Sequence, residues 1–254
     1  MTDAHIVSAH PEPQSFTAGW ARASVDAVRA LGGVAEHSDL YALGFDPAER
    51  GTLYDTADIA ERRFDPLKVQ QDAAARGALP SDLVEQVSRI KRADLLILHF
   101  PIWWFGPPAI LKGWMDRALV HGVMHAEDAR FDRGPCRGKR ALICVSTGCS
   151  AVECRPDGRE GDLRLLLWPL AQTLRYCGFD VYEPVSVHSV HGFHEPPQRL
   201  ALEQRLSATL AGQTDLLAGL EQRPLWPFNR DADFDAEGRL LPDAPSHSPF
   251  VRHV

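Results

Sequence analysis

Three aromatic side chains follow one another at Trp103, Trp104 and Phe105, directly after an apolar run and just before a glycine and two prolines. Three adjacent rings cannot all point into a protein core, so at least one must meet a surface, a partner or a ligand. Aromatic side chains commonly line pockets that bind flat organic molecules. We therefore expect the segment from Ile102 to Phe105 to contact a planar ligand. The alternative is that these rings only fill space in the core.

A second group of candidate binding residues lies near the beginning of the chain, where His10 and a proline-rich loop precede Ser15, Phe16 and Thr17. Ser15 is typical of a residue that caps a helix, and the N-terminus of a helix binds phosphate through its free N–H groups and partial positive charge. The hydroxyls and the imidazole would add further donors. The alternative is a capped helix after an ordinary loop. The dinucleotide motif Gly-x-Gly-x-x-Gly and the Walker A motif are both absent from the sequence.

A third candidate is the run Ser146, Thr147, Gly148 and Cys149, which follows another apolar segment. A glycine allows close approach of the backbone, and the hydroxyls and amides can donate to an anionic or carbonyl-rich ring. A plain turn is an equally good interpretation of this loop alone. The three loops together are more specific than any one of them.

Two other patterns are weaker. His188, His191 and His194 recur every three residues, but a path from a strand into a loop does not bring them onto one face, so we expect no metal site. Cys149 and Cys154 lie close in the sequence, and we interpret them as two free thiols rather than as a redox pair.

Apolar runs that alternate with helical segments position the three loops. Strands are expected at residues 5–9, 34–38, 95–100, 139–146 and 181–187. Helices are expected at residues 16–31, 67–76, 82–92, from 107 or 108 onward, 163–176 with an interruption at Pro169, and from 196 or 197 to about 220. Five apolar strands, each followed by a helix, predict an α/β fold with a parallel sheet covered on both faces.

The expected architecture is a flavodoxin-like, doubly wound, five-stranded sheet with the strand order 2-1-3-4-5. In such a sheet, ligands bind beyond the carboxyl ends of the strands, at the switch point between strands 1 and 3. All three loops would then meet at one crevice. We expect residues 1–222 to form this domain, and residues 223–254 to form an extended C-terminal arm packed on the domain or on a dimer partner.

Composition narrows the function classes. The 254 residues carry a net charge of -7, without the basic stripe that nucleic-acid binding needs. No apolar run approaches the ~20 residues of a membrane span, and the first residues lack the regions of a signal peptide. Five cysteines without a Cys-x-x-Cys motif fit a reducing compartment. We therefore expect a cytoplasmic protein that neither binds nucleic acid nor inserts into a membrane.

Short motifs along residues 5–220 carry a family resemblance. They are Ala9-His10 with Ser15-Phe16, then the segments 38–42, 100–106, 108–114, 134–135, 147–148, 161–162, 167–169 and 177–179. On these motifs the chain resembles the NAD(P)H:quinone oxidoreductase (DT-diaphorase) family of flavoproteins. The resemblance is less clear in residues 45–75 and in the tail. The family fold is flavodoxin-like, in agreement with the pattern of strands and helices.

The resemblance implies FAD, with FMN less favoured, held in a homodimer whose active sites lie at the subunit interface. His10, Phe16 and Thr17 match positions at the phosphate end of FAD, Ile102 to Phe105 match the loop against the isoalloxazine, and Ser146 to Cys149 match the loop at the polar edge of the ring. Arg199 matches a basic residue near the adenine half. The residues that match the quinone pocket are His125, Ala126 and Glu127.

The chemistry implied by the resemblance is a ping-pong reaction. NAD(P)H gives a hydride to flavin N5 and leaves, and a quinone or similar planar acceptor then takes its place and receives the hydride. The flavin supplies the hard chemistry, while the protein supplies stacking and electrostatics. Donors near N1 and O2 of the flavin would stabilise the negative charge of the reduced ring.

The chain departs from the family at that polar edge. The family has a Tyr and a His there, and an ungapped count places Cys154 and Glu160 at these positions. A thiol is a weak donor, and an ionised carboxylate donates nothing. Either burial protonates Glu160, or Arg155 or Arg159 supplies the positive charge, or quinone reduction is weak here. The first two explanations preserve activity and make Cys154 and Glu160 the candidate catalytic residues.

Three functions are compatible with these features. The first is an FAD-dependent NAD(P)H oxidoreductase that acts on quinones. The second is an ancillary or regulatory subunit that binds flavin and nucleotide, has weak intrinsic quinone reductase activity and acts through a partner. Turnover of NAD(P)H with menadione, free of any partner, separates the two. A flavodoxin-type electron carrier is less favoured, because the chain is long and lacks the hydroxyl-rich phosphate loop of flavodoxins.

Overall fold

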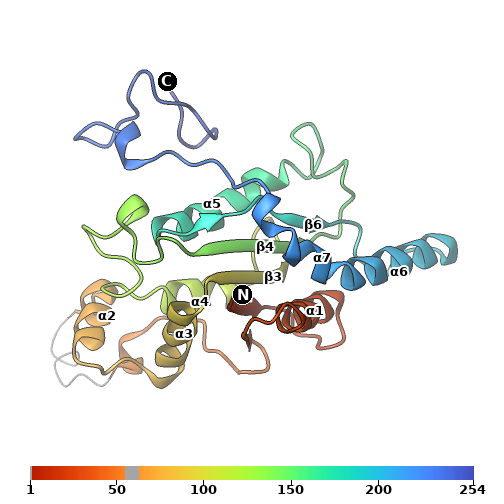
Figure 1. Ribbon diagram of the computed structural model, residues 1–254, viewed down its shortest axis with the longest axis horizontal. Helices are drawn as coiled ribbons and strands as arrows, with labels where there is room; N and C mark the ends of the chain where they lie inside the picture. Colours follow the sequence, from red (N-terminus) through yellow and green to blue (C-terminus); the bar gives the residue numbers. More distant parts are fainter. Residues whose placement is uncertain (1, 55–62) are drawn as a thin grey trace.

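A parallel β-sheet forms the centre of the computed structural model, which describes residues 2–54 and 63–254. Its longer strands are β1 (Ala4–Ser8), β2 (Ala35–Asp39), β3 (Leu95–Pro101) and β4 (Arg140–Ser146). The order is β2-β1-β3-β4-β5, and β6 also pairs with β4 (Figure 1). The expected flavodoxin-like strand order is confirmed.

The last strand differs from the expectation. Instead of one strand over residues 181–187, two short strands, β5 (Asp180–Val181) and β6 (Val185–Val187), lie beside β4. Pro184 stands between them, and a proline has no N–H to donate to a sheet ladder. β5 pairs with the beginning of β4 and β6 with its end, so the described sheet has six strands rather than five.

Helices cover both faces of this sheet. They are α1 (Phe16–Ala30), α2 (Pro66–Ala75), α3 (Ser81–Arg92), α4 (Ala109–Ala118), α5 (Leu163–Tyr176), α6 (Pro196–Ala211) and α7 (Gln213–Ala218). Short 3-10 turns occur at residues 51–53, 131–133, 220–222 and 231–233. Residues 55–62, part of the stretch in which the resemblance is less clear, lie outside the described residues.

Two expected helices differ from the prediction within their length. The interruption predicted at Pro169 is wrong, because α5 runs through it; the ring only removes one intrahelical N–H, and the hydroxyl of Thr173 donates to the Pro169 carbonyl at 2.8 Å. The single helix expected up to about residue 220 divides at Gly212 into α6 and α7. The turn at Gly212 lets Gln213 accept a hydrogen bond from the indole of Trp20 on α1, at 2.8 Å.

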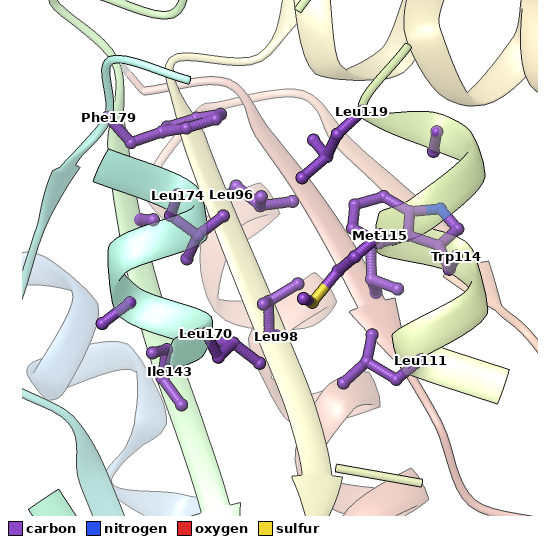
Figure 2. Packing of buried hydrophobic residues seen from close by; sticks show 14 of the residues in the cluster. Leu96, Leu98, Leu111, Trp114, Met115, Leu119, Ile143, Leu170, Leu174 and Phe179 are labelled. Carbon is purple, nitrogen blue, oxygen red and sulfur yellow. The ribbon is translucent and has the colours of Figure 1, made fainter. Parts of the chain in front are cut away.

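Strand residues alternate between two cores. Leu96 and Leu98 of β3 face the core beneath α3, α4 and α5, which Figure 2 shows with Trp114 and Leu174. Ile97 faces the opposite core, which includes residues of α1 and α7. A strand buried on both faces has no room for exposed polar side chains, so chemistry is displaced to the strand ends.

The arm after residue 222 is in contact with the domain. The backbone N–H of Trp226 donates to Val181 at 2.7 Å, and its buried indole lies under the Arg164 guanidinium. Farther along, Phe250 stacks on Trp168 of α5 at 4.7 Å between ring centroids. The boundary between domain and arm stays a prediction. Among residues 2–54 and 63–254, none of the helices has the length and apolar character that crossing a bilayer requires.

Candidate active site at the carboxyl edge of the sheet

The carboxyl ends of β1, β3, β4 and β6 lie at one edge of the sheet, because all these strands run parallel. The three predicted loops leave the sheet at this edge. Backbone bonds tie them together, since Ala9 donates to His99 at 3.0 Å and Ile102 donates to Ser146 at 2.8 Å. The topology therefore brings the candidate residues of three distant segments to one place.

The aromatic loop forms a tight turn. Trp103 and Gly106 exchange two backbone hydrogen bonds, at 2.9 and 3.1 Å, around Trp104 and Phe105. Both central residues have left-handed backbones, with φ of 49° and 63°. Turns of this kind normally use Gly or Asn at such positions, and a bulky residue there stores strain. Strain of this sort concentrates at functional sites.

The rings of this turn face outward. Trp104 is 93% exposed, Phe105 53% and Trp103 41%, whereas Ile102 is partly buried against the core. An exposed group of three large rings is unusual on the surface of a monomer and indicates a binding surface. The expectation that at least one ring leaves the core is confirmed.

The first loop reaches both other loops. The His10 ring lies edge-on to Trp103, at 5.9 Å between centroids, and the buried hydroxyl of Thr17 lies 3.3 Å from that of Ser146. Ser15 caps α1 by accepting from the Ala18 amide at 3.2 Å. Phe16 packs its ring against Trp20 in the core, at 5.2 Å between centroids, and contributes its backbone to the start of the helix.

The third loop combines donors with open space. The Thr147 hydroxyl donates to the Cys149 carbonyl at 2.9 Å and lies 2.9 Å from Nδ1 of His188. Burial lowers the pKa of His188, so its ring is neutral near pH 7. At Gly148 an added Cβ would meet no atom within 4 Å, so a ligand can approach this backbone closely.

A cavity of about 540 Å³ joins the aromatic turn to the third loop. Cys154 and Glu160 both line it, so the two residues at the departure from the family pattern do lie at the candidate site. The sequence reasoning missed Glu153, which caps its own turn by accepting from the amide and hydroxyl of Ser150. The Ser-x-x-Glu spacing was the available signal. The cavity lining comprises Ile102, Trp104, Phe105, Thr147, Gly148, Cys149, Glu153, Cys154, Glu160, Leu163 and Leu166.

Comparisons with known proteins identify the family. The model for proteins with a flavodoxin-like fold matches residues 2–210. NAD(P)H dehydrogenase (quinone) 1 of Rattus norvegicus is 38% identical over 198 residues, which cover 76% of this chain and 70% of the rat protein. Ribosyldihydronicotinamide dehydrogenase (quinone) of Mus musculus is 39% identical over 182 residues, 70% of this chain and 78% of the mouse protein. A Klebsiella pneumoniae protein assigned as a quinone reductase superimposes with a TM-score of 0.81 at 26% identity, covering 96% of this chain and 93% of its own.

The chain belongs to the NAD(P)H:quinone oxidoreductase family. It is therefore an oxidoreductase, and the predicted family and enzyme class are confirmed. The assignments of individual residues stay predictions, and the geometry of this family member bears on each of them.

Cys154 and Glu160 stand at the positions where the family has a Tyr and a His. They give this chain a neutral thiol and a carboxylate at these positions. Burial and the contact with Cys149 raise the pKa of Cys154 to about 12, so it keeps its proton. The Glu160 side chain is 37% exposed, so the burial that the first explanation requires is absent. Its carboxylate lies 3.9 Å from the Arg159 guanidinium, which pairs more closely with Glu153 at 3.1 Å, and Arg155 pairs with Asp157 at 3.3 Å. Arg159 is therefore the nearer of the two cations, but both already pair with another carboxylate.

The cavity lining does not include six predicted residues of the three loops, namely His10, Ser15, Phe16, Thr17, Trp103 and Ser146. Four other predicted residues lie outside these loops. Arg199 is exposed on α6 and donates to the His194 carbonyl at 3.3 Å. His125 lines a different cavity beside α4, with Tyr176 5.4 Å away, and burial lowers its pKa. Ala126 and Glu127 follow His125 in the chain. Within one chain the structure does not bring these four residues to the aromatic turn.

The three histidines after β6 have separate environments. His188 is bonded to Thr147, while the rings of His191 and His194 stack at 3.8 Å. Over residues 2–54 and 63–254, no group of three or more His, Cys, Asp or Glu side chains is placed to hold a metal ion.

The residues at the cavity fit a flavin. The outward-facing rings of the turn match a flat tricyclic ring, and the open space at Gly148 leaves room for the polar edge of that ring. The start of α1, near His10 and Thr17, has the donors that a phosphate needs.

Proposed function

We propose that this protein is a flavin-dependent oxidoreductase that transfers hydride from NAD(P)H to a quinone or a similar planar acceptor by a ping-pong mechanism, with FAD favoured over FMN. The observation that carries the proposal is the strained, outward-facing turn at Trp104 and Phe105, which shares one cavity with the donors at Thr147 to Cys149. Membership of the NAD(P)H:quinone oxidoreductase family supports it. A cytoplasmic location is part of the proposal, since five cysteines without a Cys-x-x-Cys motif fit a reducing compartment.

Each segment has a distinct task in this mechanism. The segment from Ile102 to Phe105 would support one face of the flavin, and Gly148 would admit its polar edge. Because a stack on one face leaves the other open, NAD(P)H and the acceptor would use the same surface in turn. The flavin, when bound, supplies the hydride chemistry. The loop hydroxyls and amides would stabilise negative charge, and Cys154 would hold a proton at Sγ.

We also propose a homodimer with the active site at the interface. The side chain of Trp104 is almost fully exposed in the single chain, which supports cover by a second copy. The roles predicted for His125, Ala126, Glu127 and Arg199 depend on the dimer, because these residues lie away from the cavity of their own chain. Sedimentation velocity on the purified protein tests the oligomeric state.

The direct test begins with the visible spectrum of the purified protein and the mass of its released cofactor. We expect a yellow protein that releases FAD, and that oxidises NADH or NADPH with menadione as acceptor and no added partner. A colourless protein that takes up neither FAD nor FMN at saturation would contradict the proposal. FMN in place of FAD would correct only the cofactor.

The second candidate is an ancillary subunit with weak intrinsic activity. Cys154 and Glu160 favour it, because a neutral thiol and a carboxylate stand where a donor pair is expected. A flavin-loaded protein whose ring is reduced by neither NADH nor NADPH in stopped flow would support the subunit. Rapid reduction followed by reoxidation with menadione supports the enzyme.

A further inference from the structure

Two cysteines meet at the rim of the cavity. Sγ of Cys149 and Sγ of Cys154 lie 2.6 Å apart, although sequence reasoning treated the two residues as independent thiols. Cys149 is half-buried and Cys154 is buried, and both line the cavity with Thr147. The pair therefore combines a thiol that a small molecule can reach, on Cys149, with a less accessible thiol in contact with it, on Cys154.

The backbone holds both residues at this separation. The carbonyl of Cys149 accepts from the Ser189 amide at 2.8 Å, and the Cys154 amide donates to Ser150 at 3.2 Å. The carbonyl of Cys154 accepts from Leu163, at the start of α5, at 3.1 Å. A disulfide needs a sulfur separation of about 2.05 Å, so closure requires only a small movement of the side chains.

The other three cysteines are in a different situation. Cys136, Cys144 and Cys177 are buried, and burial raises the pKa of each thiol; that of Cys136 rises to about 12. Thiols of this kind react slowly, because the thiolate is the nucleophile. Cys149 is the most accessible of the five cysteines, because the other four are buried.

We propose that Cys149 and Cys154 form a reversible thiol–disulfide switch at the rim of the cavity, closed by a hydroperoxide and opened by a small thiol. The Cys149 thiolate attacks the hydroperoxide, so that an S–O bond forms, the O–O bond breaks, and hydroxide leaves from hydrogen peroxide or an alkoxide from an organic hydroperoxide. The Cys154 thiol has a raised pKa, but its Sγ already lies in contact with Sγ of Cys149. It attacks that sulfur and gives up its proton in the same step: the S–S bond forms, the S–O bond breaks, and the hydroxyl leaves as water with this proton. Two small thiols reopen the bond by exchange and leave as their own disulfide.

Closure of the switch changes the cavity directly. It removes the thiol hydrogens of Cys149 and Cys154 and cross-links the segment that follows Gly148. The Thr147 hydroxyl donates to the Cys149 carbonyl, so a cross-link at Cys149 would also restrain Thr147 and the rest of the third loop. This consequence for flavin chemistry rests on the proposed function, whereas formation of the bond does not.

Mass spectrometry tests the bond. The full-length protein is treated with one equivalent of hydrogen peroxide, denatured, alkylated and cleaved with trypsin, which releases residues 141–159 as one peptide because Pro156 blocks cleavage after Arg155. We expect this peptide to be alkylated only at Cys144. Apart from the alkyl group, its mass should be two hydrogen atoms below that of the reduced peptide. Glutathione treatment before alkylation should restore alkylation at all three cysteines.

Single variants identify the roles of the two sulfurs. Cys154→Ser should stop at a sulfenic acid on Cys149 that dimedone traps, whereas Cys149→Ser should leave Cys154 reduced. In the matched control Cys136→Ala, the peptide 141–159 should still become lighter by two hydrogen atoms after peroxide treatment. A wild-type peptide that stays fully alkylated after peroxide, in protein with unchanged circular dichroism, would overturn the switch. Because these readouts need no flavin turnover, a failed switch and a failed function are distinguishable.

Discussion

A substitution at Gly148 can test ligand binding without a large effect on the stability of the fold. An added Cβ would meet no atom within 4 Å, so Gly148→Ala should change the free energy of unfolding by less than about 0.5 kcal/mol. If the flavin edge lies against this backbone, the same methyl should raise the Kd for flavin at least ~10-fold, about 1.4 kcal/mol. Fluorescence titration of the apoprotein measures the affinity.

Gly192 provides the matched control for this experiment. Its added Cβ would also meet no atom within 4 Å, and it lies outside the cavity lining. Gly192→Ala should therefore change neither stability nor flavin affinity. Equal affinities of the two variants would remove Gly148 from the site.

Glu160 is the residue whose charge is least suited to its position. Its carboxylate lines the cavity 3.9 Å from Arg159, where negative charge would oppose that of a reduced flavin. Glu160→His removes the charge and adds a donor, so we expect flavin reduction by NAD(P)H in stopped flow to accelerate ~10- to 100-fold. Asp157→Asn removes a charge from the same segment outside the cavity and should leave the rate unchanged. A rate that Glu160→His does not raise would contradict the view that the Glu160 charge slows flavin reduction.

At the scale of the element, we expect the turn at Trp104 to lower the stability of the fold and to strengthen flavin binding. Trp104 has a φ of 49° and is 93% exposed, so its side chain contributes strain but little burial. Trp104→Asn suits a left-handed backbone and should leave the free energy of unfolding equal or raise it by about 1 kcal/mol. Loss of the ring should weaken flavin binding ~10-fold, because aromatic stacking contributes up to about 1.5 kcal/mol. Trp104→Phe, which keeps a ring, should bind within ~3-fold of the wild type. Urea unfolding and flavin titration measure the two effects, and unaltered binding by Trp104→Asn would contradict the role of the turn.

The sequence allowed the elements to be predicted wherever local signals were strong. Apolar strands, the Ser15 cap and the proline-rich starts of helices gave the sheet order and the convergence of three loops. Local signals failed where tertiary contacts decide: α5 tolerates Pro169, and Gly212 divides a helix so that Gln213 can reach Trp20. The approach of Cys149 to Cys154 depends on bonds to Ser189 and Leu163, which no local pattern encodes.

At the scale of the whole molecule, two buried histidines on strands β1 and β3 of the sheet link stability to pH. His5 bonds to Ser38 at 2.9 Å and His99 to Ser24 at 2.8 Å, and both rings are fully buried. Burial lowers the pKa of each to about 3. In the unfolded chain their pKa is near 6.5, so between these values the unfolded state binds more protons.

The sign of the pH dependence follows from this difference. The stability contributed by the neutral rings is fully present above pH 6.5 and is lost as the pH falls toward 3. At pH 5 the loss is about 2 kcal/mol for each histidine, or about 4 kcal/mol for both, relative to pH 7. Asp132, whose pKa is lowered mainly by hydrogen bonds and the Arg175 charge, adds a loss only below its unfolded pKa, near 4. Burial also lowers the pKa of His37, His125 and His188, so these rings add to the loss in the same range. Urea unfolding at pH 7, 6 and 5 therefore measures the buried histidines together. His99→Gln, which can still bond to Ser24, should be less stable at pH 7 but should reduce the loss between pH 7 and 5 by about 2 kcal/mol; an undiminished loss would mean that other groups carry it.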